Sequence, residues 1–151
     1  RLYEKFLLEY YRKEHPKLSA NASQITWQLD DSENQLLPKM QTDIMLSQEN
    51  NILIIDAKYY SHMTQRQYGT NTLHSNNLYQ IFTYVKNKEF ELKNCEHTVS
   101  GMLLYAQTDE DIIPNNTYQM SGNQISVRTL NLNQDFSRIA ESLDDIVKNY
   151  F

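Results

Sequence analysis

Ile52-Leu53-Ile54-Ile55-Asp56-Ala57-Lys58-Tyr59-Tyr60 is the stretch that decides the fold, because it begins as a continuously apolar run and then acquires charges. Such a run is typical of a central strand that is buried on both faces. Asp56 and Lys58 lie two residues apart, so on a strand their side chains point to the same face. A buried charge is costly unless it is paired or binds a metal ion. The stretch therefore predicts a central strand with a candidate site at its far end.

This strand is the second arm of a predicted β-hairpin over Lys39–Tyr60, with a polar turn centred on Glu49-Asn50. In the register that this turn sets, Asp43 of the first arm lies opposite Asp56, with the two Cβ atoms about 5 Å apart. Facing carboxylates destabilise a sheet unless a cation lies between them, and Mg²⁺ takes oxygen ligands of this kind. A neighbouring lysine can orient a water and offset the negative charge of a phosphate. The pattern therefore predicts a metal-dependent site that cleaves phosphodiester bonds.

Two alternatives stay open for this hairpin. Asp56 and Lys58 can be an ordinary solvated strand end, because an Asp-x-Lys triplet alone is common. The turn also lacks the Asn-Gly or Asp-Gly pair that fixes hairpin register, so a slip by one residue would separate Asp43 from Asp56. The site prediction rests on the combination of the apolar strand, the opposed carboxylate and the helix that follows.

The split motif formed by Thr42-Asp43 and Asp56-Ala57-Lys58 resembles that of the PD-(D/E)XK nuclease superfamily. Within the superfamily, the surrounding sequence resembles the nuclease domains of the McrC family, the cleavage subunits of McrBC modification-dependent restriction systems. The stretches that carry this resemblance are Leu37–Ile44, Ile54–Tyr59 and Leu78–Tyr84. It covers the chain from the first helix to about Tyr84 and is weaker beyond. Thr42 stands where the motif has its proline; because that proline is not a metal ligand, the chemistry is little affected.

The resemblance implies an Mg²⁺-dependent DNA endonuclease in which Mn²⁺ can substitute. It places Asp43, Asp56 and the carbonyl of Ala57 among the metal ligands, with Lys58 as the residue that orients the attacking water. Glu4 on the first helix would reach the metal through a water, and a solvated position on the flank of the helix is the alternative. The implied partners are double-stranded DNA and a McrB-like AAA+ subunit that hydrolyses GTP and recognises modified cytosine.

A helix is predicted to begin at Ser75 or Asn76, with an apolar face of Leu78, Ile81, Phe82 and Val85. Gln80 and Tyr84 are four residues apart and share a neighbouring face. From spacing alone they are an ordinary polar flank. The resemblance implies instead that Gln80 assists catalysis by positioning water or phosphate, and that Tyr84 contacts DNA or only packs.

The segment Ser61–Ser75 is polar and without a pattern, which favours a mobile surface loop. Its place directly after the candidate site suggests an alternative, a segment that becomes ordered when substrate or a partner binds. Arg66 is then its natural contact with a DNA phosphate.

The remaining elements follow from periodicity. Helices are predicted over Arg1–Glu14 and from Asp135 to Tyr150, a strand over Ala22–Asp30, an apolar strand parallel to the central one over Thr98–Gln107, and a hairpin over Thr117–Leu132. This order predicts one α/β domain over residues 1–151, with a restriction-endonuclease-like mixed sheet flanked by helices.

Composition sets further bounds. The chain starts at Arg1 inside a helical pattern, so we expect it to be a fragment of a longer protein. Its one cysteine, Cys95, excludes an internal disulfide and fits a cytoplasmic location, and the four histidines show no zinc-ligand spacing. No run is long enough to cross a membrane. With a net charge of −5, any surface that binds DNA is local or lent by a partner.

Three alternative functions remain beside a McrBC-like nuclease. A stand-alone PD-(D/E)XK nuclease of another restriction or repair system would cut without a nucleotide-driven motor. A non-catalytic assembly domain is disfavoured by the intact Asp43, Asp56 and Lys58. A small-molecule hydrolase is disfavoured because the chain has only 3 glycines and no glycine-rich cradle.

Overall fold

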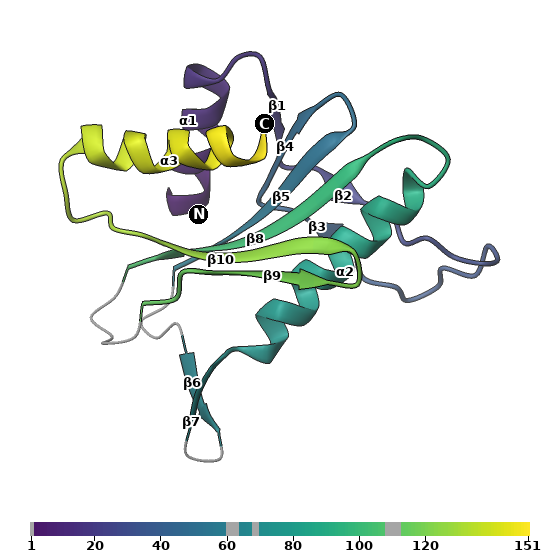
Figure 1. The fold of residues 1–151 in the computed structure, drawn as a ribbon. Coiled ribbons are helices and arrows are strands. Elements are labelled where there is room, and N and C mark those ends of the chain that lie inside the picture. Colours follow the sequence, from purple (N-terminus) through teal and green to yellow (C-terminus); the bar gives the residue numbers. More distant parts are fainter. Residues whose placement is uncertain (1, 60–63, 68–69, 108–112) are drawn as a thin grey trace.

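The computed structural model describes residues 2–59, 64–67, 70–107 and 113–151 (Figure 1). Within these residues a central six-stranded sheet has the strand order β1-β4-β5-β8-β10-β9. The strands are β1 (Ser19–Asn21), β4 (Ile44–Gln48), β5 (Asn51–Lys58), β8 (Thr98–Ala106), β9 (Asn116–Met120) and β10 (Asn123–Leu130). β8 pairs in parallel with both β5 and β10, and the other neighbours are antiparallel. The sheet is therefore mixed, as the sequence predicts.

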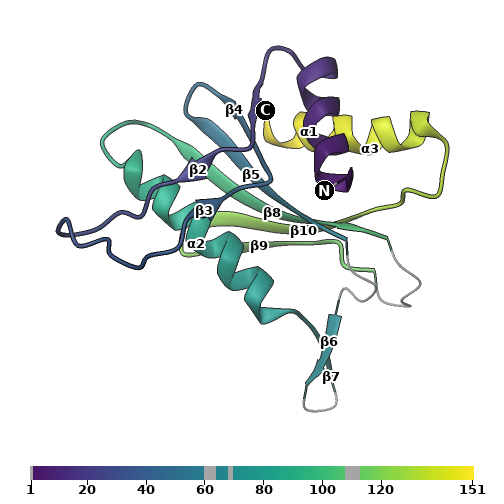
Figure 2. The same cartoon turned by 180° about the vertical axis from the view of Figure 1, so that it is seen from behind.

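Helices cover both faces of this sheet. Helices α1 (Leu2–Glu14) and α3 (Phe136–Tyr150) lie on one face, and α2 (Ser75–Glu91) lies on the other (Figures 1 and 2). α1 and α3 are tied together by the buried hydroxyl of Tyr11, which donates to the carbonyl of Leu143 at 3.0 Å. The α/β class and the flanking helices are confirmed.

Strand β5 is buried on both faces because alternate side chains enter different cores. Leu53, Ile55 and Ala57 pack in the core under α1 and α3. Ile52 and Ile54 pack in the core under α2. The same alternation directs Asp56 and Lys58 toward α2 and leaves Ala57 facing α1. The predicted central strand is confirmed, and its pleat decides which residues meet which helix.

The register of the β4–β5 hairpin is the predicted one. Ile44 lies opposite Ile55, Leu46 opposite Leu53, and Gln48 opposite Asn51. The turn closes with Glu49 at a φ of 57°, so no Asn-Gly pair is needed to hold it. A slip by one residue would move the apolar set of β4 out of its core, which explains why the register holds.

The strand predicted over Ala22–Asp30 is wrong. The structure has the short β1 before it, and only β2 (Gln24–Ile25) within it, paired with β3 (Met40–Gln41). Beyond Ile25 the chain leaves the ladder, because its polar groups find other partners. Trp27 Nε1 donates to the carbonyl of Pro38, and the Gln28 backbone N–H donates to Asn87 Oδ1 on α2.

The loop predicted over Ser61–Ser75 contains regular structure. Strands β6 (Thr64–Gln67) and β7 (Thr70–Leu73) pair as a separate antiparallel hairpin. Residues 60–63 and 68–69 of this segment lie outside the described residues. Both strands consist mainly of polar residues and β-branched threonines. They therefore lack the alternation of apolar and polar residues by which a strand is predicted from sequence.

The other predicted elements are confirmed. α1 and α3 begin and end within a residue of their predicted bounds, α2 begins at Ser75, and β8 runs parallel to β5. The β9–β10 hairpin turns through Ser121 and Gly122, both at positive φ. In the described residues no helix combines the length and apolarity that a membrane crossing requires.

Gly101 lets α2 approach the sheet closely, which generates a test. A Cβ at this position would lie 2.7 Å from Val85 Cγ2 and 2.8 Å from Ile81 Cγ1. We expect Gly101→Ala to lower the free energy of unfolding by about 1–3 kcal/mol through overpacking, measured by urea denaturation.

The matched control is the double variant Gly101→Ala/Val85→Ala, in which the smaller side chain makes room for the new methyl group. Its loss of stability is expected to be smaller than the sum of the two single losses. A Gly101→Ala protein as stable as the wild type would show that helix and sheet are not in tight contact here.

Candidate active site

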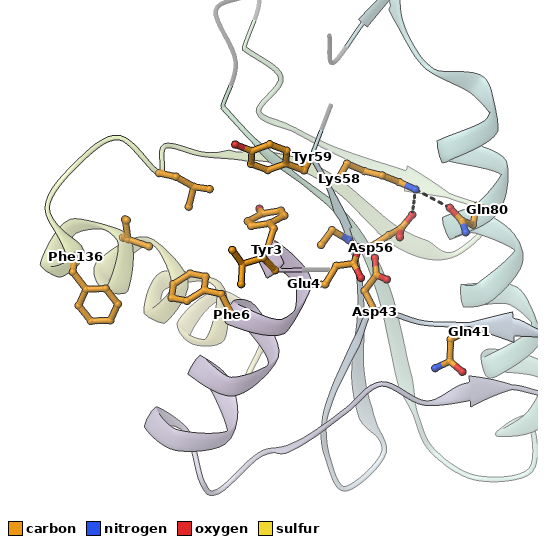
Figure 3. A pocket seen from close by; sticks show the side chains of 14 residues that line it. Tyr3, Glu4, Phe6, Gln41, Asp43, Asp56, Lys58, Tyr59, Gln80 and Phe136 are labelled. Carbon is orange, nitrogen blue, oxygen red and sulfur yellow. Dashed lines mark hydrogen bonds and ion pairs between the residues drawn. The ribbon is translucent and has the colours of Figure 1, made fainter. Parts of the chain in front are cut away.

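A chain of polar contacts runs from the end of β5 to α2 and on to β3. Lys58 Nζ lies 2.9 Å from Asp56 Oδ2 and donates to Gln80 Oε1 at 3.0 Å (Figure 3). Gln80 Nε2 donates to the Tyr84 hydroxyl at 2.9 Å, and that hydroxyl donates to the carbonyl of Gln41 at 3.3 Å. The ammonium group is thus held in one place by a carboxylate and an amide from different elements.

Asp43 directly precedes Ile44, the first residue of β4, and faces Asp56. Its Oδ2 accepts the backbone N–H of Ala57 at 2.8 Å. Figure 3 shows the carboxyl groups of Asp43 and Asp56 turned toward one another, with Glu4 of α1 beside them. The hairpin register therefore brings the two carboxylates together, as the sequence predicts.

This crowding changes the ionisation of Asp43. Its pKa is raised to about 7, most strongly by burial and further by the hydrogen bond and negative charge of Asp56 and by the charge of Glu4. The N–H of Ala57 acts in the opposite direction, but is outweighed. The cost of ionising Asp43 beside Asp56 is the cost that a bound cation would remove.

Asp56 has an oxygen, Oδ2, whose capacity to accept hydrogen bonds is not filled by the described residues. Asp56 is 4% exposed, and in the described part of the chain its Oδ2 receives no well-aligned hydrogen bond besides its ion pair with Lys58. The described residues hold no cluster of three His, Cys, Asp or Glu side chains close enough to bind a metal. Mg²⁺ commonly uses one or two carboxylates and completes its shell with water, so two carboxylates and the Ala57 carbonyl fit it.

The site opens into a cavity of about 940 Å³. Its polar lining consists of Glu4, Gln41, Asp43, Asp56, Lys58 and Gln80. The structure therefore gathers all the residues predicted for metal binding and catalysis in one cavity, from α1, β5 and α2 and the segment between β3 and β4.

The two residues predicted to contact DNA lie elsewhere. Tyr84 is 7% exposed and sits behind Gln80, where its hydroxyl joins Gln80 to Gln41. Arg66 is exposed on β6 and lies outside the residues that line the cavity. A direct DNA contact by either residue stays a prediction.

Thr42, which stands where the motif that the sequence resembles has a proline, makes two hydrogen bonds that a proline could not make together. Its backbone N–H and its Oγ1 both donate to the carbonyl of Ser23, at 3.0 and 2.7 Å. Proline has no N–H to donate, so threonine adds a tie between the base of the hairpin and the segment after β1.

Sequence reasoning missed the aromatic residues of the cavity and the role of the Gln41 carbonyl. Tyr3, Phe6 and Tyr59 line the cavity beside the carboxylates. Tyr59 directly follows Lys58, and Tyr3 directly precedes Glu4, so adjacency to the predicted site residues was the available signal.

Two comparisons identify relatives of the chain. A family model described as "McrBC 5-methylcytosine restriction system component" matches residues 1–106, which include every residue of the polar lining. The chain is also 36% identical over 152 aligned residues to a protein of Escherichia coli (strain K12) named Type IV methyl-directed restriction enzyme EcoKMcrBC. The alignment covers 99% of this chain and 42% of the relative, so the chain spans about two-fifths of the relative's length.

The raised pKa of Asp43 makes the stability of the metal-free protein depend on pH. A carboxyl whose pKa is higher in the folded state contributes stability that is complete below its unfolded pKa of about 4 and is lost as the pH rises through about 7. In EDTA we expect the Tm to fall between about pH 4 and pH 7. After allowance for partial solvent exposure, Asp43 accounts for about 1 kcal/mol, or roughly 2–4 °C, of this fall.

Asp43→Asn keeps an acceptor for the Ala57 N–H and removes the charge, so this part of the pH dependence should disappear. Asp145→Asn, an exposed substitution on α3, removes the same charge elsewhere and should leave it in place. Identical pH profiles for the two variants would contradict the crowding of Asp43 and Asp56.

Proposed function

The chain belongs to the family of McrBC 5-methylcytosine restriction system components, and from this premise we propose that it is the DNA-cleaving part of such a system, an Mg²⁺-dependent endonuclease. The observation that carries the proposal is the pair of facing carboxylates, Asp43 and Asp56, with the ammonium of Lys58 fixed beside them. A pair of crowded carboxylates has no structural benefit to a strand end, whereas it is well suited to bind a hard divalent cation.

Asp43, Asp56 and the carbonyl of Ala57 would hold the metal, with Glu4 contributing through a water. A bound Mg²⁺ supplies a Lewis acid that polarises the phosphoryl oxygen and lowers the pKa of water, and Mn²⁺ would replace it. The N–H of Ala57 keeps the carboxylate of Asp43 oriented toward Asp56.

Lys58 orients the attacking water and offsets the negative charge that develops on the phosphate. The water oxygen forms a bond to phosphorus while the bond from phosphorus to the departing sugar oxygen breaks. Gln80 keeps the ammonium of Lys58 at the cavity rim, and Tyr84 keeps Gln80 in place. Gln80 and Tyr84 thus act as positioning residues.

The family membership supports two partners, double-stranded DNA and a McrB-like AAA+ subunit that hydrolyses GTP. The net charge of −5 supports the same division of work, since an acidic chain attracts a polyanion poorly. In this proposal the partner recognises the modified base and brings the phosphodiester bond to Asp43 and Asp56.

Metal binding is the first test. We expect calorimetric titration of Mn²⁺ to show binding by the wild type and its loss in Asp56→Asn. The fall in affinity should exceed the roughly 10–100-fold that is typical when a residue outside the metal's ligands is changed. Asp145→Asn is the matched control and should bind as the wild type does. Equal binding by all three proteins would place the metal elsewhere and remove the basis of the proposal.

Lys58 separates metal binding from catalysis. Lys58→Met should retain Mn²⁺ binding but lower the rate of DNA cleavage by about 10²–10³-fold, because a donor aimed at the developing charge is lost. Gln80→Ala should lower it less, since Asp56 still holds the ammonium. The assay uses methylated duplex DNA with the GTPase subunit and GTP present.

Omitting the GTPase distinguishes the remaining alternatives. Cleavage that needs no GTPase would identify a stand-alone nuclease. Metal binding without cleavage under either condition would identify an assembly domain that has kept its cation site.

A further inference from the structure

The cavity that holds the carboxylates has a second, aromatic side. Tyr3, Phe6, Tyr59 and Phe136 line it, and Figure 3 shows them on the side of the carboxylates away from Gln80. The two sides meet at the end of β5, where Lys58 turns toward α2 and the next residue, Tyr59, contacts Tyr3 of α1. The polar and aromatic sides of the cavity are thus lined by consecutive residues, Lys58 and Tyr59.

The charges of the cavity do not suit a phosphate chain. Among its lining residues, Lys58 is the one cation and Glu4, Asp43 and Asp56 are three carboxylates. A bound divalent cation offsets part of this excess, but no basic groove for the nucleotides beyond the scissile phosphate lies within this lining. Within this lining, substrate next to the scissile bond therefore has mainly uncharged contacts from which to gain binding energy.

Tyr59 has the properties of a stacking platform. Its side chain is 71% exposed although it borders a cavity. Its ring lies 5.9 Å from that of Tyr3, at an interplanar angle of 57°. Tyr3 is 8% exposed, and its hydroxyl donates to the carbonyl of Leu104 at 3.2 Å, so the ring under Tyr59 is fixed to the sheet. An exposed aromatic ring with a fixed support is suited to stack on a flat ligand.

We propose that Tyr59 stacks on the base of an unpaired nucleotide adjacent to the scissile phosphate, with Tyr3 as its support. The inference rests on the proposed nuclease function and adds a subsite to it. Base–aromatic stacking is tolerant of sequence because every base has a π-face, which suits an enzyme whose partner reads the modification. Stacking also depends little on salt, in contrast to phosphate contacts.

The subsite implies that the DNA is locally opened at the cut. A base can reach a ring inside a cavity only after it leaves the stack of its own duplex. The cost is lowest for a mismatched or single-stranded base. The substrate class is therefore duplex DNA with an unpaired nucleotide at the cleavage position, and a motor that distorts DNA would supply it.

The test uses oligonucleotides that carry 2-aminopurine, a base whose fluorescence falls when it stacks. One is single-stranded, and one is a duplex with 2-aminopurine in a mismatch; Ca²⁺ replaces Mg²⁺ to prevent cleavage. We expect the wild type to quench the single-stranded oligonucleotide and to bind both, and Tyr59→Ala to bind them roughly 5- to 150-fold more weakly, which corresponds to about 1–3 kcal/mol per stacked base. Tyr59→Phe keeps the ring and should behave as the wild type.

Tyr79→Ala is the matched control. Tyr79 is 68% exposed, close to the value for Tyr59, but lies outside the cavity lining, so its loss should leave quenching and affinity unchanged. Wild-type behaviour of Tyr59→Ala, absence of quenching by the wild type, or equal losses in Tyr59→Ala and Tyr79→Ala would each overturn the inference. An apolar segment of a partner protein would then be the better occupant of the aromatic side.

This readout is independent of the nuclease proposal. If the wild type quenches the probe but never cleaves DNA, the stacking site is supported and the nuclease proposal is contradicted. If Tyr59→Ala cleaves DNA normally and binds the probes with unchanged affinity, the nuclease proposal is supported and the stacking site is contradicted.

Discussion

The repulsion between Asp43 and Asp56 is the constraint on which the rest of the structure depends. Two carboxylates that share a partly buried site favour separation or protonation, and the hydrogen bond and charge of Asp56 add to the burial that raises the pKa of Asp43. The fold resists it from several directions. β4–β5 pairing fixes the distance, the N–H of Ala57 fixes one carboxylate, and Lys58 compensates the other. The fold thus keeps two carboxylates together against their own repulsion, which is the arrangement that the proposed cation would stabilise.

The surrounding layers serve the same end. α2 lies close against β8 at Gly101, which brings Gln80 within reach of Lys58 on the neighbouring strand. α1 packs on the opposite face and presents Glu4 and Tyr3 at the other side of the strand end. Helix α2 therefore contributes Gln80 to the cavity, and α1 contributes Glu4 and Tyr3. The pleat of β5 directs its side chains alternately toward the two helices.

Much of this arrangement could be predicted from the sequence, because it is encoded locally. The apolar run of β5 and the polar turn determine the hairpin, and the hairpin determines that Asp43 meets Asp56. The contacts of Gln80 with Lys58 and Tyr84 follow from helical spacing once the helix is placed after β5. The failures have one physical cause: short or polar strands, such as β1 and β6, owe their conformation to a pairing partner rather than to their own apolar pattern. The aromatic side of the cavity was missed because Tyr3 and Tyr59 meet only in three dimensions.

Thr42 has a mechanical consequence. Two hydrogen bonds from this one residue end on the carbonyl of Ser23, and the next residue along the chain is Asp43. The short strands β2 and β3 and the loop between them are thereby joined by hydrogen bonds to the residue next to one of the carboxylates. A displacement of that loop would therefore reach the residue before Asp43 through these two hydrogen bonds. Thr42 thus connects the segment between β1 and β2 to the residue that faces Asp56.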